Sequence, residues 1–211
     1  MIKYVLRGDT MKTLLLEEKN IDKITEILNH GGVVALPTET VFGLAVKYDC
    51  VSGLQQLYKI KQRASNKAIT LMVPTIEDIQ KFAYVDTFSI AYIEKFMPGK
   101  ITIILNKREF IDDQLTAKLP TIGIRIPDQP ILLEILKKVG PMWVTSANLS
   151  NQKDLVYVDD VYNQFDGQID GVVNVDAGND LPSTVVQLIN QEIKILRIGS
   201  ISEKEIMEEI K

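Results

Sequence analysis

Short apolar runs alternate along the chain with stripes of apolar residues at helical spacing, and this alternation constrains the fold more than any other feature. The stripe at 21–28 is followed by Gly31, a typical helix end, and the apolar run 33–36 then stops at Pro37. Similar runs predict further strands at 41–46, 69–73, 101–105, 122–126, 142–145, 172–175, 184–189 and 193–198. Further stripes and caps predict helices at 51–58, after Thr75, at 87–97, at 131–136 and after Ser202. Strands that alternate with helices indicate an α/β layered fold, and the close spacing of the last two strands indicates a mixed sheet.

The chain has 211 residues, a length that favours a single domain over residues 1–211. It contains one cysteine, Cys50, and one histidine, His30, which excludes an intrachain disulfide and a zinc site built from cysteine and histidine. His30 stands at the predicted end of the first helix, where we expect it to help cap the helix. We expect Cys50 to be a small buried side chain.

Charge and apolar patterning limit the partners. There are 24 Lys and Arg against 28 Asp and Glu, a net charge of −4, which argues against a globally basic nucleic-acid binder but allows a local basic patch. No apolar run approaches the roughly 18 residues that span a bilayer. We therefore expect a cytoplasmic protein with no membrane partner.

The usual phosphate-binding motifs, the P-loop and the glycine-rich dinucleotide fingerprint, are absent. The best electrostatic candidate is the segment 59–67, which has four cations and no acid. In an extended conformation Lys61 and Arg63 would project from one face, exposed to solvent, where they could neutralise a polyphosphate and stabilise a pyrophosphate leaving group. The alternative is a solvated helix end whose cations are favoured by the helix dipole.

Polar residues also stand close to predicted strand ends, where ligand sites of open α/β sheets lie. The candidates are PTET at 37–40, TSANLS at 145–150, LPST at 181–184, Arg125 and Arg197. Hydroxyl and amide groups can bind a phosphate or carboxylate without bulk, and an arginine can clamp either anion. Each candidate has a simpler reading as a turn, a helix cap or a surface ion pair.

Taken in order, these segments resemble one family. The matching segments are GVVALPTETVFGL at 32–44, KQR at 61–63, PG at 98–99, TIGIRIP at 121–127, TSANLS at 145–150, PSTVV at 182–186 and ILRIG at 195–199. The set resembles the YrdC-like threonylcarbamoyl-AMP synthases in their short, single-domain form. The resemblance implies a twisted mixed sheet with flanking helices around a large basic cleft.

The resemblance also implies a reaction and its site. L-threonine, bicarbonate and ATP would give threonylcarbamoyl-AMP and pyrophosphate, the nucleotidyltransferase step that precedes N6-threonylcarbamoyladenosine formation in tRNA. The residues implied for threonine are Thr38, Lys67, Arg125, Ser146 and Ser183. Those implied for ATP are Lys61, Arg63, Thr121, Asn148 and Arg197, with Lys61 and Arg63 as the catalytic pair. Mg²⁺ is expected to be held by the ATP phosphates and by no protein side chain.

The implied partners are the three substrates and the proteins that later transfer the threonylcarbamoyl group, with tRNA or another RNA at the basic cleft. The chain departs from the family pattern at Ala64, at Lys67 to Ile69 and at Lys100, which leaves the threonine side of the site less secure than the nucleotide side. The alternative function is a non-catalytic RNA-binding or ribosome-maturation protein of the same fold. Pyrophosphate release from ATP would separate the two.

Overall fold

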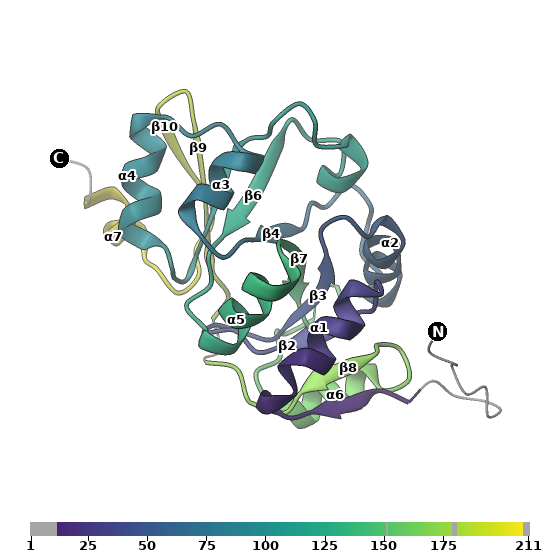
Figure 1. Ribbon diagram of the computed structural model, residues 1–211. Helices are drawn as coiled ribbons and strands as arrows, with labels where there is room; N and C mark the ends of the chain where they lie inside the picture. Colours follow the sequence, from purple (N-terminus) through teal and green to yellow (C-terminus); the bar gives the residue numbers. More distant parts are fainter. Residues whose placement is uncertain (1–11, 151, 179–180, 209–211) are drawn as a thin grey trace.

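The computed structural model describes residues 12–150, 152–178 and 181–208 (Figure 1). The strands of the described residues form one ten-stranded sheet. In spatial order they are β1 (Leu14–Leu16), β8 (Gly171–Val173), β2 (Val34–Leu36), β3 (Gly43–Lys47), β7 (Met142–Ser146), β4 (Thr70–Met72), β6 (Thr121–Arg125), β5 (Ile101–Asn106), β9 (Thr184–Ile189) and β10 (Glu192–Arg197). Parallel pairs such as β4–β6 and antiparallel pairs such as β3–β7 both occur, so the predicted mixed α/β sheet is confirmed.

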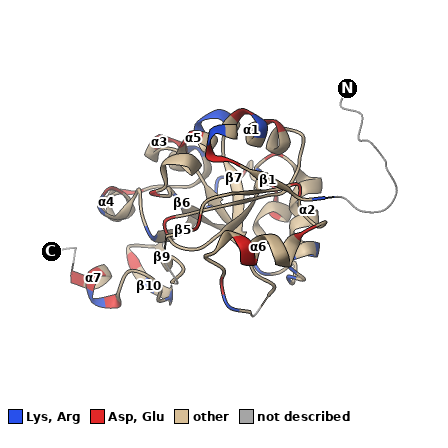
Figure 2. Cartoon of the chain, turned by 90° about the horizontal axis from the view of Figure 1, so that it is seen from below, with Lys and Arg blue, Asp and Glu red and all other residues tan. Residues whose placement is uncertain are grey.

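Helices cover both faces of this sheet. They are α1 (Ile21–Asn29), α2 (Val51–Ile60), α3 (Ile76–Phe82), α4 (Thr87–Phe96), α5 (Pro130–Val139), α6 (Val158–Phe165) and α7 (Glu203–Glu208), with 3₁₀ turns η1 (Glu18–Asn20) and η2 (Asp113–Thr116). Figure 2 shows α1 and α5 together on one side of the sheet and α6 on the other. Leu28 and Leu136 belong to the apolar core under α1 and α5, whereas Phe165 belongs to the second core.

Capping residues determine where several helices begin or end. Thr75 accepts a hydrogen bond from the Asp78 amide at 3.2 Å and so begins α3. Gly140 ends α5 with φ of +88°, a conformation that favours glycine. His30 Nδ1 donates to the Glu26 carbonyl at 2.7 Å, which confirms the expected cap of α1. The expectation for Cys50 is wrong, because its thiol is only partly buried and accepts from the Gly53 amide as the N-cap of α2.

One strand and one α-helix were not predicted. β1 is three residues long and leaves Leu14 and Leu15 exposed, so it lacks the alternation that marks a half-buried strand. α6 carries a helical stripe that includes Val161 and Phe165, but Tyr157 at its N-cap makes no side-chain capping bond. No capping side chain therefore marks the start of this helix in the sequence.

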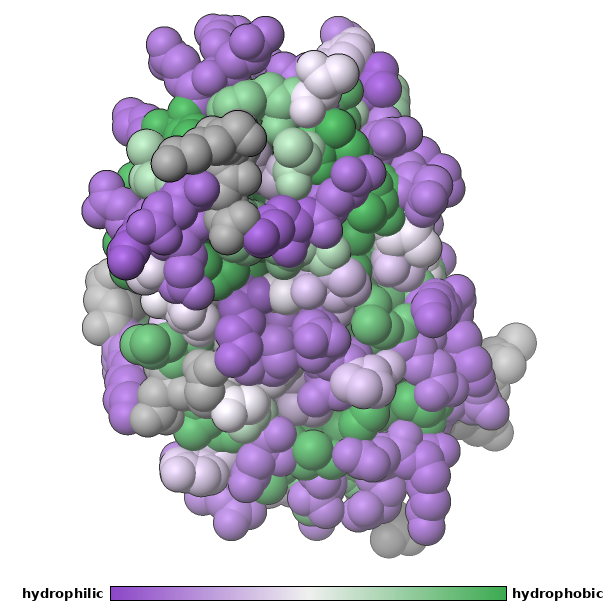
Figure 3. Space-filling model, turned by 90° about the vertical axis from the view of Figure 1, so that its left-hand side faces the viewer, coloured by the Kyte–Doolittle hydropathy of each residue, from purple (hydrophilic) through white to green (hydrophobic). Residues whose placement is uncertain are grey.

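One face of the molecule is mainly polar (Figure 3). Hydrophilic side chains cover most of the face seen in Figure 3, with apolar side chains scattered among them, as is usual for surface in contact with water. No helix in the described ranges combines the length and apolar composition that crossing a bilayer requires.

Candidate functional site

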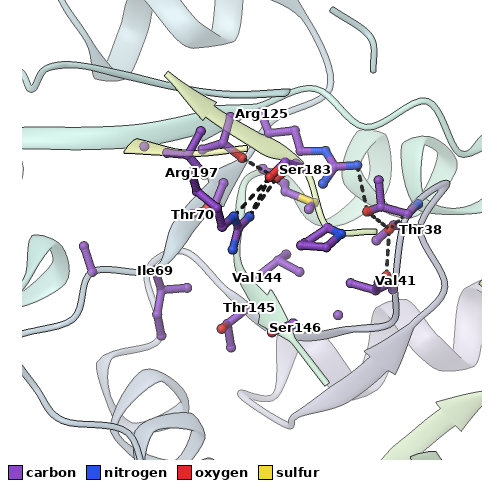
Figure 4. Close-up of a pocket in the computed structure, with 18 of the residues that line it drawn as sticks. Thr38, Val41, Ile69, Thr70, Arg125, Val144, Thr145, Ser146, Ser183 and Arg197 are labelled. Carbon is purple, nitrogen blue, oxygen red and sulfur yellow. Dashed lines mark hydrogen bonds between the residues drawn. The ribbon is translucent and has the colours of Figure 1, made fainter. Parts of the chain in front are cut away.

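A cavity of about 240 Å³ lies where the central strands β3, β4, β6 and β7 meet β5 and β9 (Figure 4). Its polar lining includes Thr38, Ser146 and Ser183, of which Thr38 lies more than a hundred residues before the two serines in the sequence. Its charged lining residues are three arginines, Arg63, Arg125 and Arg197, and no carboxylate lines it among the described residues. The cavity is thus built to attract anions while offering hydroxyl groups to a small polar ligand.

Thr38 and Thr40 form a locked turn at one side of the cavity. Thr38 Oγ1 donates to the Val41 carbonyl at 2.7 Å and accepts from the Thr40 amide at 3.0 Å. The two threonine hydroxyl oxygens are 2.8 Å apart. Both threonines are buried, so the turn presents fixed hydroxyl groups rather than mobile ones.

Ser183 and Arg197 form the opposite side. Ser183 Oγ lies 3.0 Å from Thr102 Oγ1, and Arg197 donates to the Ser183 carbonyl from Nε and Nη2 at 3.2 and 2.8 Å (Figure 4). The pairing of β10 with β9 shifts register between Ile195 and Arg197. A β-bulge of this kind re-aims a side chain, and here it accompanies an arginine that lines the cavity. Burial lowers the pKa of Arg197, and repulsion by Arg125 and Arg63 adds to this.

Lys61 lies behind the cavity and is the main departure from the sequence-based expectation. The expected exposure is wrong: Lys61 is only 1% exposed, at the C-cap of α2, and the residues around it form a turn rather than an extended strand. Its Nζ donates to the Ser146 carbonyl, to the Asn148 carbonyl at 2.7 Å and to Asn148 Oδ1 at 2.8 Å. All three acceptors are uncharged, so Lys61 holds the 146–148 loop without a bound carboxylate to balance its charge.

Arg63 closes the loop that follows α2. Its Nε donates to the Lys67 carbonyl at 3.1 Å and its Nη2 to the Ala68 carbonyl at 2.8 Å. Tyr58 donates to the same Lys67 carbonyl at 2.9 Å. The loop is therefore held from two sides, and Arg63 reaches the cavity as part of this closed turn.

The structure brings some predicted site residues to the cavity and leaves others outside its lining. Thr38, Arg63, Arg125, Ser146, Ser183 and Arg197 line it. Lys61 and Asn148 lie behind it, joined to each other. Lys67 has an exposed side chain, and Thr121 pairs with Asn106 at the start of β6; neither lines the cavity.

Sequence reasoning missed Thr102 and Asp154 as neighbours of the site, and it missed the partner of Glu39. Glu39 pairs with Arg125, Thr102 meets Ser183, and the charge of Asp154 acts on both Lys61 and Arg197. Glu39 belongs to the PTET motif, so its place at the site could be predicted from the sequence, whereas its pairing with Arg125 could not. Thr102 and Asp154 carried no signal, because their partners are 81 and 43 or more residues away in the chain.

The described residues include no group of three or more His, Cys, Asp or Glu side chains able to hold a metal ion. The cavity lining, with three arginines and no carboxylate among the described residues, offers no anionic side chain to a metal ion.

The buried position of Lys61 predicts an unusual pH dependence of stability. Burial lowers its pKa from 10.5 to about 8; repulsion by Arg63 adds to this and attraction by Asp154 opposes it. From pH 8 to 10.5 the unfolded chain keeps a proton that the folded chain has released, so the free energy of unfolding rises with pH in this window. We expect the contribution of Lys61 to rise by up to about 3 kcal/mol. Denaturant titrations across the window should show this rise in the wild type and not in Lys61→Met; parallel curves for the two proteins would contradict it.

Comparison with known proteins adds a family context to this geometry. The Sua5/YciO/YrdC family model, described as "Telomere recombination", matches residues 26–199. A threonylcarbamoyl-AMP synthase candidate of Methanocaldococcus jannaschii is 32% identical over 93% of the chain and 95% of its own length. The threonylcarbamoyl-AMP synthase of Rattus norvegicus is 32% identical over 82% of the chain and 64% of its own length.

Solved structures give the same result for the fold. Sua5 of P. abyssi matches with a TM-score of 0.88 at 25% identity, over 94% of this chain and 60% of that one. A structure of P. abyssi Sua5 complexed with L-threonine gives the same TM-score and coverage at 24% identity. YciO of E. coli matches with a TM-score of 0.84 at 24% identity, over 92% of this chain and 98% of that one. The chain thus spans less than two thirds of the rat and P. abyssi proteins.

Proposed function

The chain belongs to the Sua5/YciO/YrdC family, and from this premise we propose that it is a nucleotidyltransferase that makes threonylcarbamoyl-AMP from L-threonine, bicarbonate and ATP. The observation that carries the proposal is the cavity with three arginines, several fixed hydroxyl groups and no carboxylate in its described lining. A triphosphate needs convergent cations, and an amino acid needs a carboxylate clamp with hydroxyl partners. One cavity supplies both.

We assign the two substrates to different groups of the residues that line the cavity or support its lining. Thr38, Arg125, Ser146 and Ser183 hold threonine, whose carboxylate pairs with Arg125. Arg63 and Arg197 hold the phosphates, and Lys61 acts through Asn148 and the 146–148 loop, which it holds in place. Lys67 and Thr121 take part only if the segments that carry them, the loop after α2 and the start of β6, move toward the cavity.

The reaction on this arrangement needs no covalent enzyme intermediate. The threonine amine and bicarbonate form a carbamate with loss of water, and a carbamate oxygen attacks the α-phosphorus of ATP as pyrophosphate leaves. Arg63 and Arg197 bind the charge that gathers on the leaving group, while the threonine side fixes the direction of attack. Mg²⁺ bound to the ATP phosphates supplies further charge neutralisation.

The product is consumed by a transfer to tRNA, so we place the protein in the cytoplasm beside proteins that carry out that transfer. The alternative of a non-catalytic RNA-binding protein is not favoured, because the relatives named above are synthases. A bare phosphate-binding groove also has no need for hydroxyl groups fixed on both sides of a 240 Å³ cavity.

Isotope labelling tests the proposed reaction. With ¹⁸O-labelled bicarbonate, the label is expected in the threonylcarbamoyl-AMP and, after attack at the carbamoyl carbon has broken its C–O bond, in AMP, which keeps the bridging oxygen. Mass spectrometry of the quenched reaction distinguishes labelled from unlabelled AMP. Unlabelled AMP formed at the same rate with and without threonine would show simple ATP hydrolysis instead.

A further inference from the structure

Glu39 forms a buried ion pair with Arg125 beside the cavity. Its Oε1 lies 2.7 Å from Arg125 Nη2, with the side chains of Arg125 and Glu39 4% and 11% exposed. The same oxygen accepts from the Asp128 amide at 3.0 Å, which ties the turn at 37–40 to the chain just after β6. Glu39 itself does not line the cavity. It thus acts on the site through Arg125.

The backbone of Glu39 has little freedom to move. A Cβ atom added at Gly178 would lie 2.3 Å from the Glu39 carbonyl oxygen, so the two backbones are in close contact there. The Gly178 amide also donates to the Thr38 carbonyl at 2.9 Å. The Glu39 backbone is therefore fixed, and the length of the Glu39 side chain decides where its carboxylate meets Arg125.

The hydrogen bonds of Arg125 define which nitrogen of its guanidinium is free. Nε donates to the Gly99 carbonyl at 3.1 Å, and Nη2 donates to Thr40 Oγ1 at 3.2 Å as well as to Glu39. Among the described residues no partner is seen for Nη1, and Arg125 lines the cavity. Gly99, Thr40 and Glu39 thus engage Nε and Nη2 and leave Nη1 for a ligand.

We propose that Glu39 is a positioning residue, which fixes the orientation of Arg125 so that Nη1 meets the carboxylate of the amino-acid substrate. This inference rests on the proposed function, because it assumes that Arg125 binds threonine. The role depends on the reach of the Glu39 oxygen rather than on its charge alone. Its Oε2 is buried without a partner in the described part of the chain, so a glutamine NH₂ group can take that place while its oxygen keeps both contacts.

Three variants separate reach from charge. Glu39→Ala removes the acceptor, Glu39→Asp keeps the charge but withdraws the oxygen by one methylene, and Glu39→Gln keeps the reach without the charge. We expect Glu39→Ala and Glu39→Asp to weaken L-threonine binding about tenfold in calorimetry, the scale of one charge-assisted hydrogen bond. Glu39→Gln should stay within about threefold of the wild type. Binding of a non-hydrolysable ATP analogue should change less than about threefold in all three.

A stability control excludes a general loss of structure. Thr13 is buried away from the cavity, where it donates to the Ile169 carbonyl at 2.7 Å, so Thr13→Ala should lower the melting temperature without changing threonine affinity. The proposal would be overturned if Glu39→Asp bound threonine like the wild type and Glu39→Gln did not, because the charge of residue 39 alone would then decide the affinity. Equal losses for threonine and the ATP analogue would overturn it as well.

Arg125→Gln distinguishes this proposal from the function on which it rests. If Arg125→Gln leaves threonine affinity unchanged, the assignment of Arg125 to threonine is wrong. If it abolishes binding while Glu39→Ala and Glu39→Asp bind normally, only the role of Glu39 is wrong. With both correct, adding Glu39→Ala to Arg125→Gln causes no further loss of threonine affinity.

Discussion

Lys61→Met is expected to lower the free energy of unfolding by about 2 kcal/mol, because it removes the three hydrogen bonds that Lys61 Nζ gives to the 146–148 loop and leaves the Asn148 carbonyl without a donor among the described residues. Activity should fall to the background rate even where the variant is folded, since the 146–148 loop loses its anchor. Denaturant titration and turnover of the folded variant measure the two effects separately.

Lys59→Met is the matched control for this substitution. Lys59 lies two residues earlier on α2 and is exposed, so its loss should change stability by less than about 0.5 kcal/mol. If Lys61→Met is as stable as Lys59→Met, Lys61 does not hold the loop in the way described.

Valine is expected to bind at least about 10⁴-fold more weakly than threonine, because a site built to pair a substrate hydroxyl rejects the analogue that lacks it. Serine lacks only the methyl group, which is worth about 1–3 kcal/mol in an apolar pocket, so it should be rejected less strongly. Calorimetry with the three amino acids and an ATP analogue gives the ranking. Equal affinities for threonine and valine would mean that the cavity does not hydrogen-bond the hydroxyl group of the substrate.

The sequence predicts the order of elements well because each apolar run and stripe is a local signal. The stripe at 21–28 and the run at 33–36 became α1 and β2 with almost the expected bounds. β1 escaped prediction since three residues with two exposed leucines give no period. It is a strand only because Leu15 pairs with Val172, more than 150 residues away.

The candidate site divides in the same way. The motif segments led to six residues that line one cavity, among them Thr38, Arg125 and Ser183. Burial and pairing could not be predicted, because they depend on neighbours distant in the chain. Lys61 appears in the sequence as part of a cationic run, yet its partners lie 85 and 87 residues away and turn an expected surface cation into a buried anchor. The contacts of Glu39 with Arg125 and with the Asp128 amide could not be predicted for the same reason.

Pyrophosphate release from ATP tests the central claim most directly. The full chain, incubated with ATP and Mg²⁺, is expected to release pyrophosphate rapidly only when L-threonine and bicarbonate are both present. Omitting either one, or replacing threonine by valine, should reduce release to background. Release that is independent of threonine and bicarbonate, or no release in the complete mixture from a folded protein that binds ATP, would contradict the proposed function.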